Sequence, residues 1–117
     1  MTLLKLYIAG KITGLVYDEA LRKFAEAEAH LKRAGHEPIN PMKANGLDGD
    51  GNQYEWAEYM KRDIPLLLEC DGIYLLPDWA GSRGAVLEEH IARELGMRIF
   101  HANTRNGETN NGTSEEY

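Results

Sequence analysis

Cysteine is nearly absent from the sequence, with Cys70 as the only one in 117 residues. A single thiol excludes a disulfide within the chain and a metal cage of cysteine thiolates, and it fits a reducing compartment. Long apolar runs are also missing: none approaches the roughly 20 residues of a transmembrane helix, and the N-terminus lacks the pattern of a secretory signal. We therefore expect a soluble, unprocessed, cytoplasmic protein without a membrane partner.

Basic charge is in the minority, because 13 lysines and arginines stand against 19 aspartates and glutamates, for a net charge of −6. A nucleic-acid polymer is therefore not expected as a partner, since phosphate contacts need a basic face. Small anionic ligands are still compatible with this balance, through local backbone amides. The length suits one domain with a single core, and an apolar fraction of 43% is near the globular norm.

Strand and helix patterns alternate along the chain. Strands are expected over residues 3–9, 36–40, 73–76 and 97–101, and helices over 17–34, 54–70 and 82–96. This order predicts a three-layer α/β/α sandwich of the Rossmann or flavodoxin type, with a four- to five-stranded parallel sheet. Pro38 indicates an edge position for its strand. Residues 1–101 should form the domain, and the polar stretch 102–117 should be a disordered tail.

The stretch from Cys70 to Gly96 organises the chain. Ser82 can cap the helix that follows the buried strand, and Gly96 can end it in a left-handed conformation. Glu88 falls within the apolar stripe of that helix. The stripe consists of Gly84, Ala85, Ile91, Ala92 and Leu95. A carboxylate that faces a core must be paired, neutralised or placed at the lip of a cavity. The pattern leaves open a functional Glu88 or one at the edge of the stripe.

Pro65 interrupts the pattern of the helix over 54–70. A proline cannot donate into the helix ladder, so we expect a kink or a break near Arg62-Asp63-Ile64. Asp63 could cap the segment after that break, or it could point at the binding crevice. The spacing is compatible with both.

Two loops are candidates for ligand contacts. The loop from Gly10 to Gly14 follows the first strand at the edge where parallel sheets bind ligands, although it could be a plain turn, and it matches neither a Walker A nor a dinucleotide motif. Residues 42–53 form either a mobile flap over the crevice or an ordinary solvated loop. A calcium loop starting at Asp48 would need glycine at position six and glutamate at position twelve, and has neither. Glu26 and His30 lack a third ligand, so no metal is expected.

A set of motifs along residues 3–101 resembles the nucleoside 2-deoxyribosyltransferase superfamily, most closely its short phage and bacterial branch. The matching motifs are Tyr7-Ile8-Ala9-Gly10, Ile12-Thr13-Gly14, Asn40-Pro41, Trp56, Met60, Arg62-Asp63-Ile64, Cys70-Asp71 and Ser82-x-Gly84-Ala85-x-x-Glu88-x-x-x-Ala92-x-x-x-Gly96. The last motif, with the upstream aspartate, is the most specific of them.

The resemblance implies cleavage of the N-glycosidic bond of a 2-deoxynucleoside or its 5′-monophosphate, without a cofactor. Glu88 matches the glutamate that attacks the anomeric carbon, after which the deoxyribosyl group passes to another base or to water. Tyr7 matches a tyrosine that positions the nucleophile or the sugar. Asp63 matches an aspartate near the base, and either Asp63 or Asp78 could be the general acid.

The resemblance also implies residues that bind the substrate. Ser82 and Gly84 match the helix N-terminus that holds the phosphate in the monophosphate-cleaving branch. Ala9, Gly10 and Lys11 match the loop on the sugar side. Lys11 stands where many relatives have proline, which could favour a phosphate.

Relatives complete their site with a polar residue from a neighbouring subunit, and Asn103 is the plausible equivalent here, so a homo-oligomer is expected. The alternative function is a non-catalytic module that binds or sequesters a nucleotide, which Lys11 and the loose match of Asn103 favour. A weaker third reading is a structural partner protein, whose sign would be an exposed apolar patch outside the crevice. Transferase and hydrolase activity differ only in the acceptor that reaches the glycosyl-enzyme.

Overall fold

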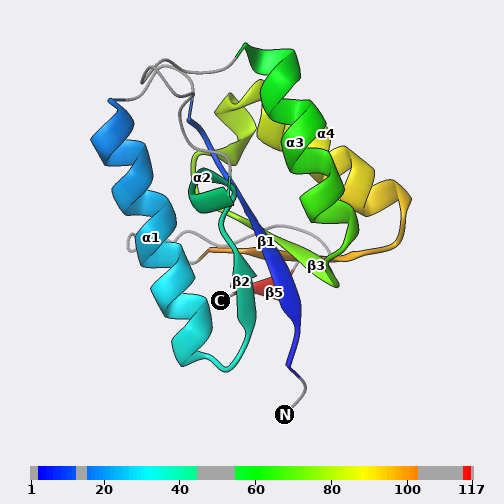
Figure 1. Ribbon diagram of the computed structural model, residues 1–117. Helices are drawn as coiled ribbons and strands as arrows, with labels where there is room; N and C mark the ends of the chain where they lie inside the picture. Colours follow the sequence, from blue (N-terminus) through cyan, green and yellow to red (C-terminus); the bar gives the residue numbers. More distant parts are fainter. Residues whose placement is uncertain (1–2, 13–15, 45–54, 103–114, 117) are drawn as a thin grey trace.

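The computed structural model describes residues 3–12, 16–44, 55–102 and 115–116. The strands are β1 (Lys5–Ala9), β2 (Glu37–Ile39), β3 (Gly72–Leu75), β4 (Arg98–His101) and β5 (Glu115–Glu116), and the helices are α1 (Tyr17–Arg33), α2 (Pro41–Ala44), α3 (Trp56–Leu68), the 3-10 turn η1 (Trp79–Gly81) and α4 (Arg83–Glu94) (Figure 1).

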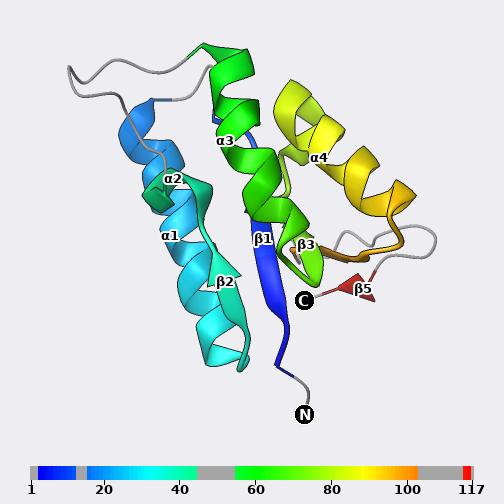
Figure 2. The same cartoon turned by 45° about the vertical axis from the view of Figure 1, so that its right-hand side comes forward.

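The strands form a five-stranded sheet in the order β2-β1-β3-β4-β5, and every pair is parallel. Helices α1 and α2 lie on one side of β1, and α3 and α4 lie on the other (Figures 1 and 2). The predicted fold class, a parallel sheet between two helical layers, is confirmed. β2 is an edge strand, as Pro38 predicted.

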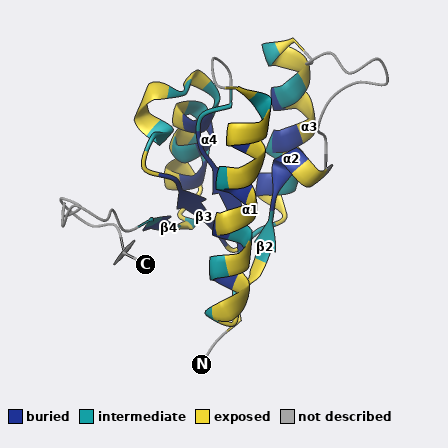
Figure 3. Ribbon diagram, turned by 90° about the vertical axis from the view of Figure 1, so that its left-hand side faces the viewer, coloured by how far each residue is buried: buried dark blue, intermediate teal, exposed yellow. Residues whose placement is uncertain are grey.

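Alternate residues of β1 serve the two faces of the sheet. Leu6 and Ile8 pack in the cluster that α1 covers, and Tyr7 and Ala9 pack in the cluster toward α3 and α4. Both sets are buried because β1 lies between two strands and two helical layers. The helix expected over residues 17–34 is observed as α1, and its buried residues, Ala20, Phe24, Ala27 and Leu31, recur at the helical period. Figure 3 shows the exposed outer face of this helix in front of the buried strands.

The expected break near Asp63 is wrong, because α3 runs without interruption from Trp56 to Leu68 with Pro65 inside it. Asp63 therefore lies in mid-helix and does not cap a second segment. Met60, Asp63 and Leu67 are the buried residues of α3. Packing of this face against the sheet and α4 outweighs the hydrogen bond that Pro65 cannot donate.

The ends of α4 agree with the sequence signals. The Ser82 side chain caps α4, and Gly96 has a φ of 72° just after its end. Leu95 was expected in the core, but it is 61% exposed. It is the C-cap residue of α4 and no longer follows the helical period.

The predicted boundary at residue 101 stays a prediction. Glu115–Glu116 pairs with β4 as the two-residue strand β5, which departs from the expected disorder at these two positions. The rest of the tail after Ala102, with Asn103 in it, lies outside the described residues, as do residues 45–53 of the expected flap. Within the described ranges, the structure has no helix that is both long enough and apolar enough to cross a membrane.

Candidate active site

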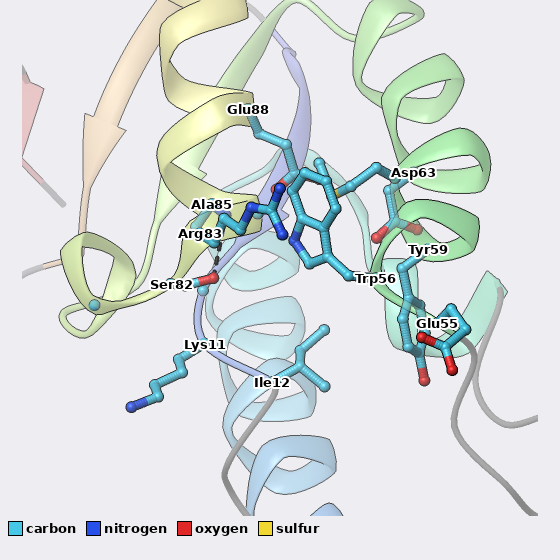
Figure 4. Close-up of a pocket in the computed structure, with 14 residues that line it drawn as sticks. Lys11, Ile12, Glu55, Trp56, Tyr59, Asp63, Ser82, Arg83, Ala85 and Glu88 are labelled. Atoms are coloured by element: carbon cyan, nitrogen blue, oxygen red, sulfur yellow. Dashed lines mark hydrogen bonds between the residues drawn. The ribbon is translucent and has the colours of Figure 1, made fainter.

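A pocket of about 620 Å³ lies between the β1–α1 loop and the N-terminal halves of α3 and α4 (Figure 4). It lies beyond the carboxyl ends of β1 and β3, where open parallel sheets bind ligands, and its volume suits a small molecule. Its lining residues are Gly10, Lys11, Ile12, Glu55, Trp56, Tyr59, Met60, Asp63, Gly81, Ser82, Arg83, Gly84, Ala85 and Glu88.

Tyr7 and Glu88 meet at the buried side of this pocket. The alternation along β1 directs Tyr7 toward α4, and the helical period of α4 directs Glu88 toward the sheet. The Tyr7 hydroxyl donates a hydrogen bond of 2.6 Å to Glu88 Oε2. Tyr7 is 1% exposed and Glu88 is 4% exposed, although Glu88 still lines the pocket. The structure thus brings together two of the predicted site residues.

Burial dominates the acid–base properties of this pair. Loss of solvent raises the pKa of Glu88 to about 8, and the negative charge of Asp63 adds to this rise. The hydrogen bond from Tyr7 acts in the opposite direction, because it favours the carboxylate. Burial also raises the pKa of Tyr7 well above its ordinary value, with help from Glu88 and Asp63. Tyr7 therefore keeps its proton as a donor, and Glu88 has the perturbed pKa typical of functional carboxyl groups.

Asp63 reaches the same pocket from α3. Its side chain is 5% exposed and lines the pocket, and its charge affects both Tyr7 and Glu88. Of the two placements that the sequence left open, the structure has the one that faces the crevice.

The N-terminus of α4 forms another wall of the pocket. Ser82 Oγ accepts a hydrogen bond of 3.1 Å from the amide of Ala85, and both Ser82 and Gly84 line the pocket. A Cβ atom at Gly84 would lie only 3.1 Å from Met60 Sδ, so α3 and α4 approach each other closely here. Gly10 permits a similarly close approach on the opposite wall, where a Cβ atom would lie 2.9 Å from Leu76 Cβ.

Among the described residues, three of the predicted site residues do not line the pocket: Asp78, Ala9 and Tyr7, the last of which lies behind Glu88. Asp78 accepts a hydrogen bond of 3.1 Å from the amide of Lys11 and forms a short ion pair with Lys23. Ala9 is buried in β1, where its carbonyl oxygen accepts a hydrogen bond from the Leu76 amide. Asp63 therefore lies at the pocket and Asp78 does not, and the chain reaches the pocket wall only at Gly10.

Trp56, Tyr59 and Arg83 line the pocket but were given no role from the sequence. The spacing of Trp56, Tyr59 and Asp63, which puts them near one face of a helix, could have revealed the two aromatic residues. Arg83 had a weaker signal: it is the first residue of α4, where the helix dipole disfavours a positive charge. Its guanidinium carbon lies 3.6 Å from the centre of the Trp56 ring.

Other candidate chemistries find little support in the described residues. No three histidine, cysteine, aspartate or glutamate side chains in these ranges are arranged to hold a metal ion. The thiol of Cys70 donates to the carbonyl oxygen of Leu66, and burial raises its pKa to about 11. A thiol with so high a pKa is a poor nucleophile at neutral pH.

The family of the chain follows from a comparison of its sequence. A family model described as "Domain of unknown function (DUF4406)" matches residues 4–101. The chain belongs to this family. A search of the curated proteins finds no match.

Two solved structures share the fold of this DUF4406 protein. One is a 2-deoxyribosyltransferase from the psychrotolerant bacterium Bacillus psychrosaccharolyticus, with 21% identity, a TM-score of 0.66, and coverage of 92% of this chain and 77% of that one. The other is a conserved protein from Enterococcus faecalis V583, with 16% identity, a TM-score of 0.64, and coverage of 89% and 65%. Both likenesses show the fold, which agrees with the superfamily that the motifs resemble. The phage and bacterial branch and the homo-oligomer stay predictions.

Proposed function

We propose that this protein cleaves the N-glycosidic bond of a 2-deoxynucleoside or its 5′-monophosphate, with Glu88 as the nucleophile. The observation that carries the proposal is the buried hydrogen bond of 2.6 Å between Tyr7 and Glu88 at the side of a pocket of substrate size. The shared fold with a 2-deoxyribosyltransferase supports it.

The geometry supports a distinct role for each residue in the reaction. Tyr7 binds Glu88 Oε2, so we assign the attack to the other carboxylate oxygen, Oε1. As it forms a bond to C1′, the C1′–N bond breaks and its electron pair leaves with the base, which takes a proton from Asp63. In the second step another base or a water attacks C1′, releases Glu88 and returns a proton to Asp63.

Glu88 must lose its proton before it can attack, and the Asp63 carboxylate accepts this proton and then passes it to the leaving base. Its pKa of about 8 makes the carboxylate the minor form at neutral pH, and the hydrogen bond from Tyr7 stabilises that form. The developing positive charge on the sugar further favours the carboxylate in the transition state.

The second candidate function is a module that binds a nucleotide without turnover. The raised pKa of Glu88 is the observation that favours it, because a neutral carboxyl group donates hydrogen bonds to a ligand but is a poor nucleophile. Both functions use the same pocket, so only a turnover measurement separates them.

The test is release of free base from deoxynucleosides and their 5′-monophosphates, followed by chromatography with and without a second base. We expect release by the wild type and its loss in Glu88→Gln. Glu89→Gln is the matched control, since Glu89 is the next residue of α4 and pairs with Arg93 outside the pocket. A requirement for the second base identifies a transferase, and release without it identifies a hydrolase. Binding without release from any substrate contradicts the enzyme and favours the module.

A further inference from the structure

Trp56 and Arg83, the first residues of α3 and α4, form a contact between the two helices. The guanidinium carbon of Arg83 lies 3.6 Å from the centre of the indole ring, and both side chains line the pocket (Figure 4). The indole is also held against α4, because its Nε1 would lie 3.5 Å from a Cβ atom at Gly84. The ring is therefore fixed by packing, and one of its faces is directed toward Arg83.

This contact lies nearer the pocket mouth than the proposed catalytic groups. Both helices begin at the edge where the strands end, and α4 descends about 6 Å between Gly84 and Glu88. Asp63 lies seven residues beyond Trp56, about 10 Å further along α3. A base that extends from a sugar at Glu88 toward the pocket mouth would therefore reach Trp56.

Arg83 is weakly held in its position. It is exposed, and the described residues offer it no carboxylate within ion-pair distance. It also lies at the N-terminus of α4, where the dipole disfavours a cation. The indole face is its visible partner, and a cation–π contact at an exposed site is a weak one.

We propose that the nucleobase of the substrate stacks on Trp56 and that Arg83 competes with the base for this indole face. At 3.6 Å the guanidinium is in contact with the ring, so no second planar group fits between them. A base must displace the guanidinium, and it gains a larger stacking area on the same ring. The inference rests on the proposed function, since it takes the ligand to be a nucleoside.

Competition predicts opposite effects for the two residues. Removal of the stacking face in Trp56→Ala weakens nucleoside binding about 5- to 100-fold. Removal of the competitor in Arg83→Ala tightens it about two- to fivefold. A purely structural role for the contact would weaken binding in both variants.

The experiment is calorimetric titration of a 2-deoxynucleoside panel, with free deoxyribose as the ligand without a base. The full chain carries Glu88→Gln so that no turnover occurs. Trp56→Phe keeps an aromatic face and should retain most of the affinity, which guards against a folding defect in Trp56→Ala. Arg93→Ala, also on α4 but outside the pocket, is the matched loss of one positive charge and should bind as the parent does.

A second measurement reports the stacking directly. The chain has two tryptophans, so Trp79→Phe leaves Trp56 as the only indole emitter. The fluorescence of Trp56 should change on addition of nucleoside and remain constant on addition of deoxyribose. In Arg83→Ala the same change should occur at lower nucleoside concentration.

Weaker or unchanged nucleoside binding in Arg83→Ala overturns the competition, and unchanged binding in Trp56→Ala overturns the stacking. If the wild type releases base while these variants bind as the parent does, the inference fails and the proposed function stands. If no nucleoside binds and no base is released, both fail.

Discussion

The Tyr7 hydroxyl donates a hydrogen bond of 2.6 Å to Glu88 Oε2, across 81 positions of sequence. This bond joins the middle of β1 to the second turn of α4, and both residues are buried. The carboxyl group of Glu88 is buried, accepts one hydrogen bond and lies near a second carboxyl group, that of Asp63. The protein therefore determines its ionisation. Its charge state is therefore the property that the predictions below test first.

Base release should fall as the pH rises through 8. The reactive form has Glu88 ionised and Asp63 protonated, so the two carboxyl groups together hold one proton, and this proton is lost above the Glu88 pKa of about 8. We expect kcat/KM to decrease through a midpoint near pH 8, as measured by initial rates between pH 6 and 10. A rate that is independent of pH over this range would contradict the shared proton of Glu88 and Asp63.

Tyr7→Phe should lower activity and move this midpoint to higher pH. The phenylalanine keeps the ring in the core but removes the hydrogen bond that holds the pKa of Glu88 down. A hydrogen bond to a charged group contributes about 1.5–3 kcal/mol, so we expect a loss of roughly 10- to 100-fold near neutral pH. The loss relative to wild type should be smaller at pH 10. Tyr74→Phe, in the other core cluster, is the control, and an equal midpoint in Tyr7→Phe and wild type would be evidence against the role of the bond.

The fold was predictable because its signals are local. Ser82 and Gly96 mark the ends of α4 by their own chemistry, and the stripe of α1 follows from a simple period. The two failures have different causes. Pro65 stays inside α3 because the packing of that helix outweighs one missing hydrogen bond, and Leu95 belongs to the apolar stripe by spacing but follows the last helical residue.

The site was predictable only in part. The position of Glu88 in an apolar stripe indicated a buried carboxylate, and the resemblance added Tyr7 and Asp63. The contact between Arg83 and Trp56 joins two helices, and the ion pair of Asp78 with Lys23 joins a loop to α1. Neither contact has a local sequence signal, because each depends on how elements far apart in the chain pack together.

Glu88→Gln should make the stability less dependent on pH. The folded pKa of Glu88, about 8, lies above its ordinary value of 4.5, so the folded state binds this proton more tightly than the unfolded state. Its contribution to stability is complete below about pH 4.5 and is lost as the pH rises through 8. The free energy of unfolding of the wild type should therefore fall over this window relative to that of the variant.

Urea denaturation at pH 5, 7 and 9 measures this difference. We expect Glu88→Gln to be more stable than the wild type at pH 9 and to lose that advantage toward pH 5. Glu89→Gln, with a partly exposed carboxylate paired to Arg93, should follow the wild type. Parallel curves for Glu88→Gln and wild type would show that burial does not perturb Glu88.

Asp78 should act on the pocket through the Lys11 loop. Its carboxylate binds the Lys11 amide and Lys23, so Asp78→Ala frees the segment that carries Gly10 and Lys11 on the pocket wall. We expect a loss of roughly 10-fold in kcat/KM, mainly through KM, because a misplaced binding loop weakens substrate positioning.

Asp78→Asn separates this positioning role from that of a general acid. The amide oxygen of asparagine can still accept a hydrogen bond from the Lys11 amide, so we expect partial recovery of KM. Lys23→Met should resemble Asp78→Asn, because both variants remove the ion pair but keep the contact with the Lys11 loop. The pH profile should keep its shape in all three variants. If Asp78 were the acid that protonates the leaving base, Asp78→Asn would be as inactive as Asp78→Ala. In that case kcat would fall more than KM rises. The loss of activity would be largest for the bases that are the poorest leaving groups. That pattern would return Asp78 to the catalytic role and leave Asp63 without it.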